Sequence, residues 1–326
     1  MSIGQTLRGR YRIIQQIGEG GFGKTYLAED KDLPGKPQCV VKLLKPPSTA
    51  PNALNTAKRL FDTEAKMLYE LGRSHDQIPK LFAHFEENQE FYLVQEYIEG
   101  HDLTHEIQPG KPISETLVIQ LLQDILEVLE FVHKQKVIHR DINPRNLRRR
   151  ASDGKIVLID FGAVKEVMTQ MTHLQGQISP TICIGTPGYM PSEQEKGHPK
   201  LCSDIYAVGM VGIEALTGVF PHQLSHDPNT LEVVWKNRVS ISPKLTDILE
   251  KMVRYDFNQR YQSATEVLQD LLPSPVPPPP LPSPNKLGLI LIGLGVATTV
   301  FFFSFQLLNK QTQTTPTPAP TDPIVF

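Results

Sequence analysis

The chain has 326 residues, with 33 Lys and Arg against 35 Asp and Glu, so its formal net charge is −2. A near-neutral balance gives no reason to expect nucleic acid as a partner. The cysteines Cys39, Cys183 and Cys202 have no CxxC spacing, which argues against a disulfide-stapled secreted domain and against a zinc ribbon. The chain also contains 28 prolines, about twice the usual share.

The first third of the chain alternates turns with strand-like runs, at residues 11–18, 24–30, 38–44 and 91–98. From Glu115 to Lys134 the pattern changes, and apolar residues recur at the spacing of an amphipathic helix. These residues are Leu117, Leu121, Leu122, Ile125 and Leu129. A β-rich beginning before a mostly helical remainder predicts an α+β fold with two lobes. No internal repeat is visible.

Residues 18–23 read GEGGFG and lie between two strand-like runs. The dinucleotide-binding form of GxGxxG opens a helix, whereas the residues from Lys24 to Ala28 resemble a strand. The pattern therefore favours a hairpin whose glycines let the backbone approach phosphates closely, with an ordinary turn as the alternative. Lys42 interrupts the otherwise apolar run CVVKLL, and is either a phosphate contact or a surface lysine on an edge strand.

Several later segments carry polar residues in a distinctive order. They are residues 137–146 (VIHRDINPRN), 159–162 (IDFG), 185–193 (GTPGYMPSE), 203–209 (SDIYAVG) and Arg260. Together with the glycine-rich segment and Lys42, this set resembles the eukaryotic-type (Hanks-type) serine/threonine protein kinases. The phrases GGFGKTYLAED, GTPGYMPSEQ and RYQSATEVL resemble the bacterial, cyanobacterial-style branch. The resemblance covers about residues 8–272.

The resemblance implies a bilobal kinase fold over residues 1–272, with a β-rich N-lobe at about 1–98 and a mainly helical C-lobe at about 99–272. It implies transfer of the γ-phosphoryl group of ATP to Ser and Thr hydroxyls of protein substrates, with Mg²⁺ or Mn²⁺ as cofactor. ATP and protein substrates are therefore the expected partners, with autophosphorylation also expected. A pseudokinase scaffold that binds nucleotide or partners is the main alternative, and a small-molecule phosphotransferase is a third.

The resemblance also assigns roles to individual side chains. Asp141 would accept the proton of the substrate hydroxyl, and Lys42, oriented by Glu64, would contact the α- and β-phosphates. Asn146 and Asp160 would hold the metal, because carboxylate and amide oxygens suit a hard cation. The expected nucleotide-binding set is Gly18, Glu19, Gly20, Gly21, Phe22, Gly23, Thr25, Val40, Lys42, Glu64, Gln95, Glu96, Ile98, Asn146 and Asp160.

Within this set, Gln95 corresponds to the gatekeeper and residues 96–98 to the hinge that meets adenine through its backbone. The resemblance further implies a buried ion pair between Glu193 and Arg260, a bracing role for Asp204 under the catalytic loop, and a bridge from Thr186 to the catalytic Asp.

The sequence departs from the family pattern at two places. Asn143 stands where serine/threonine kinases have a Lys that contacts the γ-phosphate. Arg145, four residues after Asp141, is expected to supply the missing cation, as an Arg does there in many tyrosine kinases. Arg145 is therefore the third catalytic candidate beside Asp141 and Lys42. Arg148 occupies a usually apolar position under adenine, where it would stack on the base or weaken nucleotide binding.

Arg140 precedes the catalytic Asp, and kinases with that Arg are often switched by phosphorylation of the activation segment. This segment, from Asp160 to Glu193, offers the hydroxyls of Thr169, Thr172, Ser179 and Thr181. We expect at least one of them to be autophosphorylated, with Thr181 and Thr172 as the first candidates.

The prolines concentrate at residues 273–284 (PSPVPPPPLPSP), which predicts a polyproline II linker at 273–286, with a docking peptide as the alternative. Residues 287–308 lack any charged side chain and would span about 33 Å as a helix, the thickness of a membrane core. They predict a transmembrane helix rather than a buried core helix. Residues 309–326 are rich in Thr and Pro and are expected to form a short disordered tail.

The flanking Lys286 and Lys310 do not set the orientation of this helix. Because ATP requires a cytoplasmic kinase domain, we expect a single-pass protein of the cell membrane with the tail on the outer side. Gly293 and Ala297 give a small-xxx-small pair suited to helix packing. A dimer through the kinase domain or through this helix is compatible with the sequence.

Overall fold

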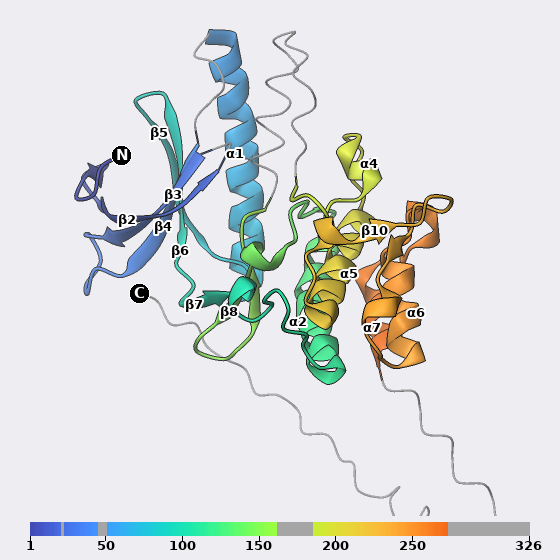
Figure 1. The fold of residues 1–326 in the computed structure, drawn as a ribbon. Helices are drawn as coiled ribbons and strands as arrows, with labels where there is room; N and C mark the ends of the chain where they lie inside the picture. The colour runs from blue at the N-terminus through green and yellow to red at the C-terminus, as the bar shows by residue number, and fades with distance from the viewer. Residues whose placement is uncertain (21–22, 45–50, 162–184, 273–326) are drawn as a thin grey trace, which may run out of the picture. The chain divides into compact units, whose positions relative to one another are not determined.

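A six-stranded antiparallel sheet forms the N-terminal lobe (Figure 1). Its strands are β1 (Thr6–Leu7), β2 (Tyr11–Gly20), β3 (Gly23–Asp30), β4 (Gln38–Leu44), β5 (Leu81–Glu87) and β6 (Glu90–Glu96), in the order β1-β2-β3-β4-β6-β5. Helix α1 (Pro51–Ser74) lies beside the sheet and contacts β5 and β6. The computed structural model describes residues 1–20, 23–44, 51–161 and 185–272.

Successive side chains of β4 point to opposite faces of the sheet. Cys39, Val41 and Leu43 are buried in the core of the N-terminal lobe, whereas Val40 and Lys42 on the opposite face are only partly buried. The strand register places Thr25 opposite Lys42 and Gln95 opposite Val40. Residues predicted from separate segments to bind nucleotide therefore share one face of the sheet.

The predicted glycine-rich hairpin joins β2 and β3, with Gly20 paired to Gly23. Gly21 and Phe22 lie outside the described residues. A Cβ atom on Gly23 would lie 2.0 Å from the carbonyl oxygen of Leu43, so only glycine allows β3 and β4 to approach this closely. Glu19 and Lys24 form an ion pair across the same hairpin, at 3.1 Å.

The C-terminal lobe is built on helices. Helix α2 (Glu115–Lys134) coincides with the predicted helix and packs against α5 (Leu201–Thr217) and α7 (Ala264–Leu271). Helix α6 (Pro243–Met252) also contacts α5 and α7, and the short α4 (Ser192–Glu195) precedes α5. Two small antiparallel sheets complete the lobe: β7 (Gly100–Asp102), β8 (Leu147–Arg150) and β9 (Ile156–Leu158), and β10 (Ser225–His226) with β11 (Val233–Val234).

Residues Met1–Pro273 form one unit of the chain, separate from residues 274–326. The predicted linker, transmembrane helix and tail, together with Thr169, Thr172, Ser179 and Thr181, lie outside the described residues. Within the ranges that are described, no helix is both long enough and apolar enough to cross a membrane.

Candidate active site

The carboxylate of Asp141 lies at the centre of the candidate site, in the loop between α2 and β8. It is 5% exposed. The hydroxyl of Thr186 donates to Asp141 Oδ1 at 2.9 Å, which confirms the predicted bridge. The Asn146 amide donates to Asp141 Oδ2 and to the Asp141 carbonyl, both at 2.8 Å. These bonds fix the carboxylate in one orientation.

Asp204, near the start of α5, braces the catalytic loop as predicted. Its carboxylate accepts the backbone N–H groups of His139 and Arg140 at 2.8 Å each, and the His133 ring at 2.9 Å. His139 is fully buried, and this burial lowers the pKa of its imidazole. Arg140 has a positive φ of 69°, a conformation that costs energy outside glycine and that surrounding contacts must hold.

Lys42 forms an ion pair with Asp160, which follows β9. Asp160 also has a positive φ, of 61°, so its backbone is held in a sparsely populated conformation. Glu64 on α1 is buried, at 4% exposure. The predicted contact between Lys42 and Glu64 is not among the ion pairs of the described residues. The structure thus brings Lys42 to the expected metal ligand of the other lobe.

The donor chemistry of Asn146 and Asp160 fits a hard cation. Both hydrogen bonds that the Asn146 amide nitrogen donates go to Asp141, which leaves the amide oxygen as the available acceptor. Asp160 adds a partly exposed carboxylate. The described residues contain no group of three or more His, Cys, Asp and Glu side chains that could hold a metal. Asn146 and Asp160 would supply two oxygen ligands, and a magnesium ion usually takes further ligands from water and substrate oxygens.

Asn143 is integrated into the catalytic loop. Its amide donates to the Asp141 carbonyl at 2.9 Å and to Thr186 Oγ1 at 3.1 Å, with a longer contact of 3.3 Å to Asp141 Oδ1. Its side-chain oxygen accepts the backbone N–H of Arg145. In the sequence, Asn143 stands out only as the position of a missing lysine. Its amide, two residues after Asp141, was the signal that could have predicted this network.

Arg145 is exposed, and its side chain has no ion pair within the part of the chain that the structure describes. Its positive charge nevertheless acts on Tyr189, where it opposes the increase in the pKa of the phenol. Arg145 therefore lies near Tyr189, in the segment that follows Thr186.

The hinge follows β6. Glu96 donates its backbone N–H to the Lys80 carbonyl at 2.9 Å, and Ile98 is 5% exposed. Arg148 lies against this hinge, because its guanidinium donates to the carbonyls of Ile98 and Gly100. The sequence alone had left the direction of the Arg148 side chain open.

A second polar cluster confirms the predicted ion pair between Glu193 and Arg260. Arg260 donates to both carboxylate oxygens of Glu193, at 2.6 and 3.1 Å, and Ser203 donates to the same carboxylate at 2.7 Å. Both charged residues are nearly fully buried. The pair joins α4 to the segment that precedes α7 and thereby anchors the end of the 185–193 segment.

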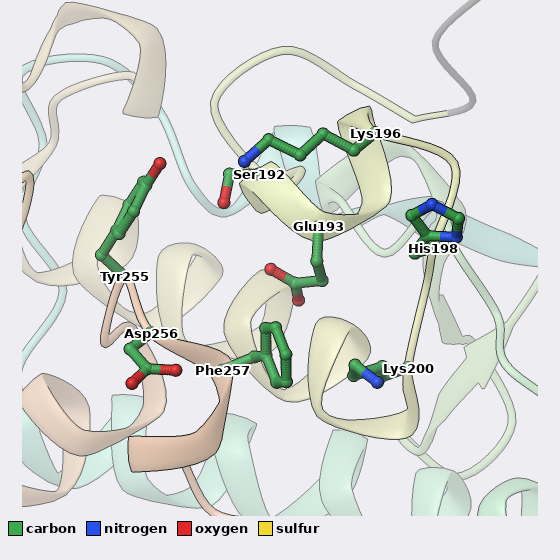
Figure 2. Close-up of a pocket in the computed structure, with 8 residues that line it drawn as sticks. All are labelled: Ser192, Glu193, Lys196, His198, Lys200, Tyr255, Asp256 and Phe257. Carbon is green, nitrogen blue, oxygen red and sulfur yellow. The ribbon is translucent and has the colours of Figure 1, made fainter.

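A groove of about 420 Å³ lies beside this ion pair. Figure 2 shows Glu193 pointing from α4 towards the loop that carries Asp256 and Phe257. The lining residues are Ser192, Glu193, Lys196, His198, Lys200, Tyr255, Asp256 and Phe257. None of them is a predicted catalytic or nucleotide-binding residue, so the groove is separate from the candidate active site.

Tyr189 and Glu214 form a buried pair that the sequence analysis did not identify. The Tyr189 hydroxyl donates to the Glu214 carboxylate. Burial raises the pKa of Glu214 to about 7 and also raises the pKa of Tyr189. The signal in the sequence was a single Glu within the otherwise apolar residues 205–216, a residue type that is rarely buried without a partner.

The protein has a glycine-rich hairpin, a lysine–aspartate ion pair and a braced aspartate in the loop between α2 and β8. This combination of fold and site is typical of the phosphotransferases. Residues 11–272 match the protein kinase domain family. The chain therefore belongs to the protein kinase family.

The chain is similar to cyanobacterial serine/threonine kinases. It is 43% identical over 268 residues to serine/threonine-protein kinase PknA of Nostoc sp., covering 82% of this chain and 48% of that protein. It is 44% identical over 266 residues to serine/threonine-protein kinase C of Synechocystis sp., covering 81% and 50%. The chain thus spans about half the length of these curated relatives.

Solved structures show the same fold. The kinase domain of Mycobacterium tuberculosis PknI aligns with a TM-score of 0.61 and 21% identity, covering 83% of this chain and 98% of that one. The apo form of PpkA-294 aligns with a TM-score of 0.65 and 24% identity, covering 83% and 99%. The bilobal kinase fold with a β-rich N-lobe is therefore established for the described part of the chain.

Proposed function

We propose that this protein is an active serine/threonine protein kinase that transfers the γ-phosphoryl group of ATP to Ser and Thr hydroxyls of proteins. The observation that carries the proposal is the Asp141 carboxylate, which is held by Asn146 and already accepts a hydroxyl hydrogen bond from Thr186. A carboxylate held in this way is arranged to accept a substrate hydroxyl as well. The names of the cyanobacterial relatives support the same class of substrate.

Each side chain then has a defined task. Asp141 orients the substrate hydroxyl and accepts its proton. Lys42, which pairs with Asp160 in this structure, would contact the phosphates of ATP, and Asp160 and Asn146 would hold the metal through their side-chain oxygens. Magnesium, when bound, neutralises negative charge on the phosphates. Arg145 adds a positive charge near the γ-phosphate, where the family's lysine is missing.

Transfer of labelled phosphate from ATP to the protein itself and to a basic generic protein substrate tests this function. The full chain should label both, and the Asp141→Asn variant should label neither. Phosphoamino-acid analysis should then detect phosphoserine or phosphothreonine. Labelling no higher than in Asp141→Asn would instead support a pseudokinase, the alternative that Asn143 motivates.

We further propose that residues 287–308 anchor the protein in the cell membrane, with the kinase domain in the cytoplasm. The support is the length of this uncharged segment and the need of the domain for ATP. Membrane fractionation of the full chain and of a chain that ends at Pro273 tests the anchor. The full chain should sediment with membranes and resist extraction by salt, and the shortened chain should not.

Autophosphorylation in residues 162–184 completes the proposal, with Thr172 and Thr181 as acceptors. Its support is Arg140, a cation next to the catalytic Asp that a nearby phosphate would attract. Mass spectrometry of the full chain after incubation with ATP should find phosphate in this segment, and the Asp141→Asn protein should carry none.

A further inference from the structure

Arg148 is the second residue of β8, where its backbone pairs with Asp102 of β7. Its Nε donates to the Ile98 carbonyl at 2.5 Å, and its Nη2 donates to the Gly100 carbonyl at 2.7 Å. The guanidinium also lies over the ring of Tyr97, 5.5 Å from the centroid. One side chain of the C-terminal lobe thus contacts two residues of the hinge, Tyr97 and Ile98, and also Gly100 at the start of β7.

The neighbouring arginines of β8 behave differently. Arg149 pairs with Glu106, and Arg150 pairs with Asp76 and Asp153. Arg148 contacts no carboxylate among the described residues, and its hydrogen bonds go to backbone carbonyls instead. An arginine that only stabilises the strand would be expected to form ion pairs with carboxylates, as its two neighbours do. The hydrogen bonds of Arg148 instead fix its guanidinium against the backbone beside the hinge.

The hinge backbone around Arg148 is closely packed. Ala151 donates to the Glu99 carbonyl at 2.8 Å. Gly100 has a φ of 138°, and a Cβ atom there would lie 2.0 Å from the Arg149 carbonyl oxygen. The backbone N–H of Ile98, in contrast, donates to no acceptor in the described ranges. Among the described residues, Ile98 thus has an unpaired N–H donor, while its carbonyl accepts from the Arg148 guanidinium.

We infer that Arg148 is a specificity-determining residue of the nucleotide site, which selects purines without an amino group at C2. The inference rests on the proposed kinase function. In an antiparallel strand pair, the N–H and the C=O of one residue both face the same partner strand. The N–H and C=O of Ile98 can likewise face neighbouring positions on one edge of a purine base. When N1 of the purine accepts from the Ile98 N–H, the substituent on C2 lies near the Ile98 carbonyl. Adenine has a C–H at C2, whereas 2,6-diaminopurine has an amino donor there.

An amino group at that position has to share the Ile98 carbonyl oxygen with the Arg148 guanidinium. It also meets a positively charged guanidinium, with which it competes as a second donor. With an apolar side chain at residue 148, the Ile98 carbonyl becomes available and the amino group gains one hydrogen bond. A single net hydrogen bond corresponds to about a three- to tenfold gain in affinity.

The test compares ADP with 2-amino-ADP, the diphosphate of 2,6-diaminopurine riboside, by calorimetric titration of the full chain with magnesium present. Wild-type protein should bind 2-amino-ADP no more tightly than ADP. In Arg148→Leu, the affinity for 2-amino-ADP relative to ADP should rise about three- to tenfold. Arg150→Leu is the matched control, because it removes the same charge from the same strand without touching the hinge, and it should keep the wild-type ratio.

Arg148→Met keeps an unbranched side chain of similar reach without a donor, and it provides the same comparison if the Leu variant does not fold. An affinity ratio that stays at the wild-type value in Arg148→Leu and Arg148→Met overturns the inference. So does an equal rise in Arg150→Leu. Normal ADP binding with an unchanged ratio refutes only the role of Arg148, whereas failure of the wild type to bind ADP refutes the proposed function itself.

Discussion

Thr186 donates its hydroxyl hydrogen bond to Asp141, with 2.9 Å between Thr186 Oγ1 and Asp141 Oδ1. The two residues are 45 positions apart in the chain, so this bond joins the last part of the activation segment to the catalytic loop. The Asn143 amide contacts both partners. The position of the catalytic carboxylate therefore depends on the placement of residues 185–191.

Replacing Thr186 by alanine should lower kcat about tenfold, because Asp141 loses one of the hydrogen bonds that orient it, a loss of about 1.4 kcal/mol. Thr186→Ser keeps the hydroxyl and should remain close to the wild-type rate. Initial rates on a basic generic protein substrate measure both variants. Equal rates for Thr186→Ala and the wild type would show that the bond has no catalytic role.

Arg145→Ala should reduce kcat by at least tenfold, because its charge is expected to replace the lysine that Asn143 displaces. The double variant Asn143→Lys with Arg145→Ala should recover part of this loss, since it restores a cation two residues after Asp141. Asn143→Lys alone controls for the lost amide bonds to Thr186. A wild-type rate in Arg145→Ala would remove Arg145 from the catalytic set.

The buried pair of Glu193 and Arg260 should dominate the stability of its region. Arg260→Ala leaves Glu193 as a buried charge and should lower the free energy of unfolding by about 3–5 kcal/mol. Arg12→Ala removes one partner of a more exposed pair with Glu29, whose contact of 2.5 Å is close to the 2.6 Å between Arg260 and Glu193, and should cost at most about 1 kcal/mol. Urea unfolding of both variants measures the difference, and similar losses would contradict this assignment.

Local patterns predicted much of this structure. The helical spacing from Glu115 to Lys134 gave α2 its observed bounds, and the run 38–44 is the strand β4. The motifs also predicted the contacts of Asp204 and Thr186, because these residues occupy fixed positions in the motifs of the kinase family. Such predictions succeed where periodicity or a fixed motif determines the geometry.

Other relationships depend on tertiary packing and could not be predicted from residue spacing. Arg148 has a long side chain, and nothing in the sequence indicated that it would reach back 50 residues to Ile98. Tyr189 and Glu214 pair across 25 residues between a loop and α5. The ion pair of Lys42 with Asp160 depends on how the two lobes meet, which no local propensity determines.

Glu214 should make stability depend on pH. Burial raises its pKa from 4.5 to about 7 in the folded protein. Between these values the unfolded chain has lost the proton, whereas the folded protein keeps it. The stability contributed by this carboxyl group is therefore fully present below about pH 4.5 and is lost as the pH rises towards 7. The shift corresponds to at most about 3 kcal/mol.

Glu214→Gln cannot titrate, so its free energy of unfolding relative to the wild type should rise by about 2–3 kcal/mol between pH 5 and pH 8. Urea unfolding of both proteins at pH 5, 6, 7 and 8 measures this change. Tyr189→Phe removes the hydrogen bond that favours the charged carboxylate, so it should raise the pKa of Glu214 further and move the loss of stability to higher pH. Parallel pH profiles for the wild type and Glu214→Gln would show that Glu214 has the same pKa in the folded and unfolded chains.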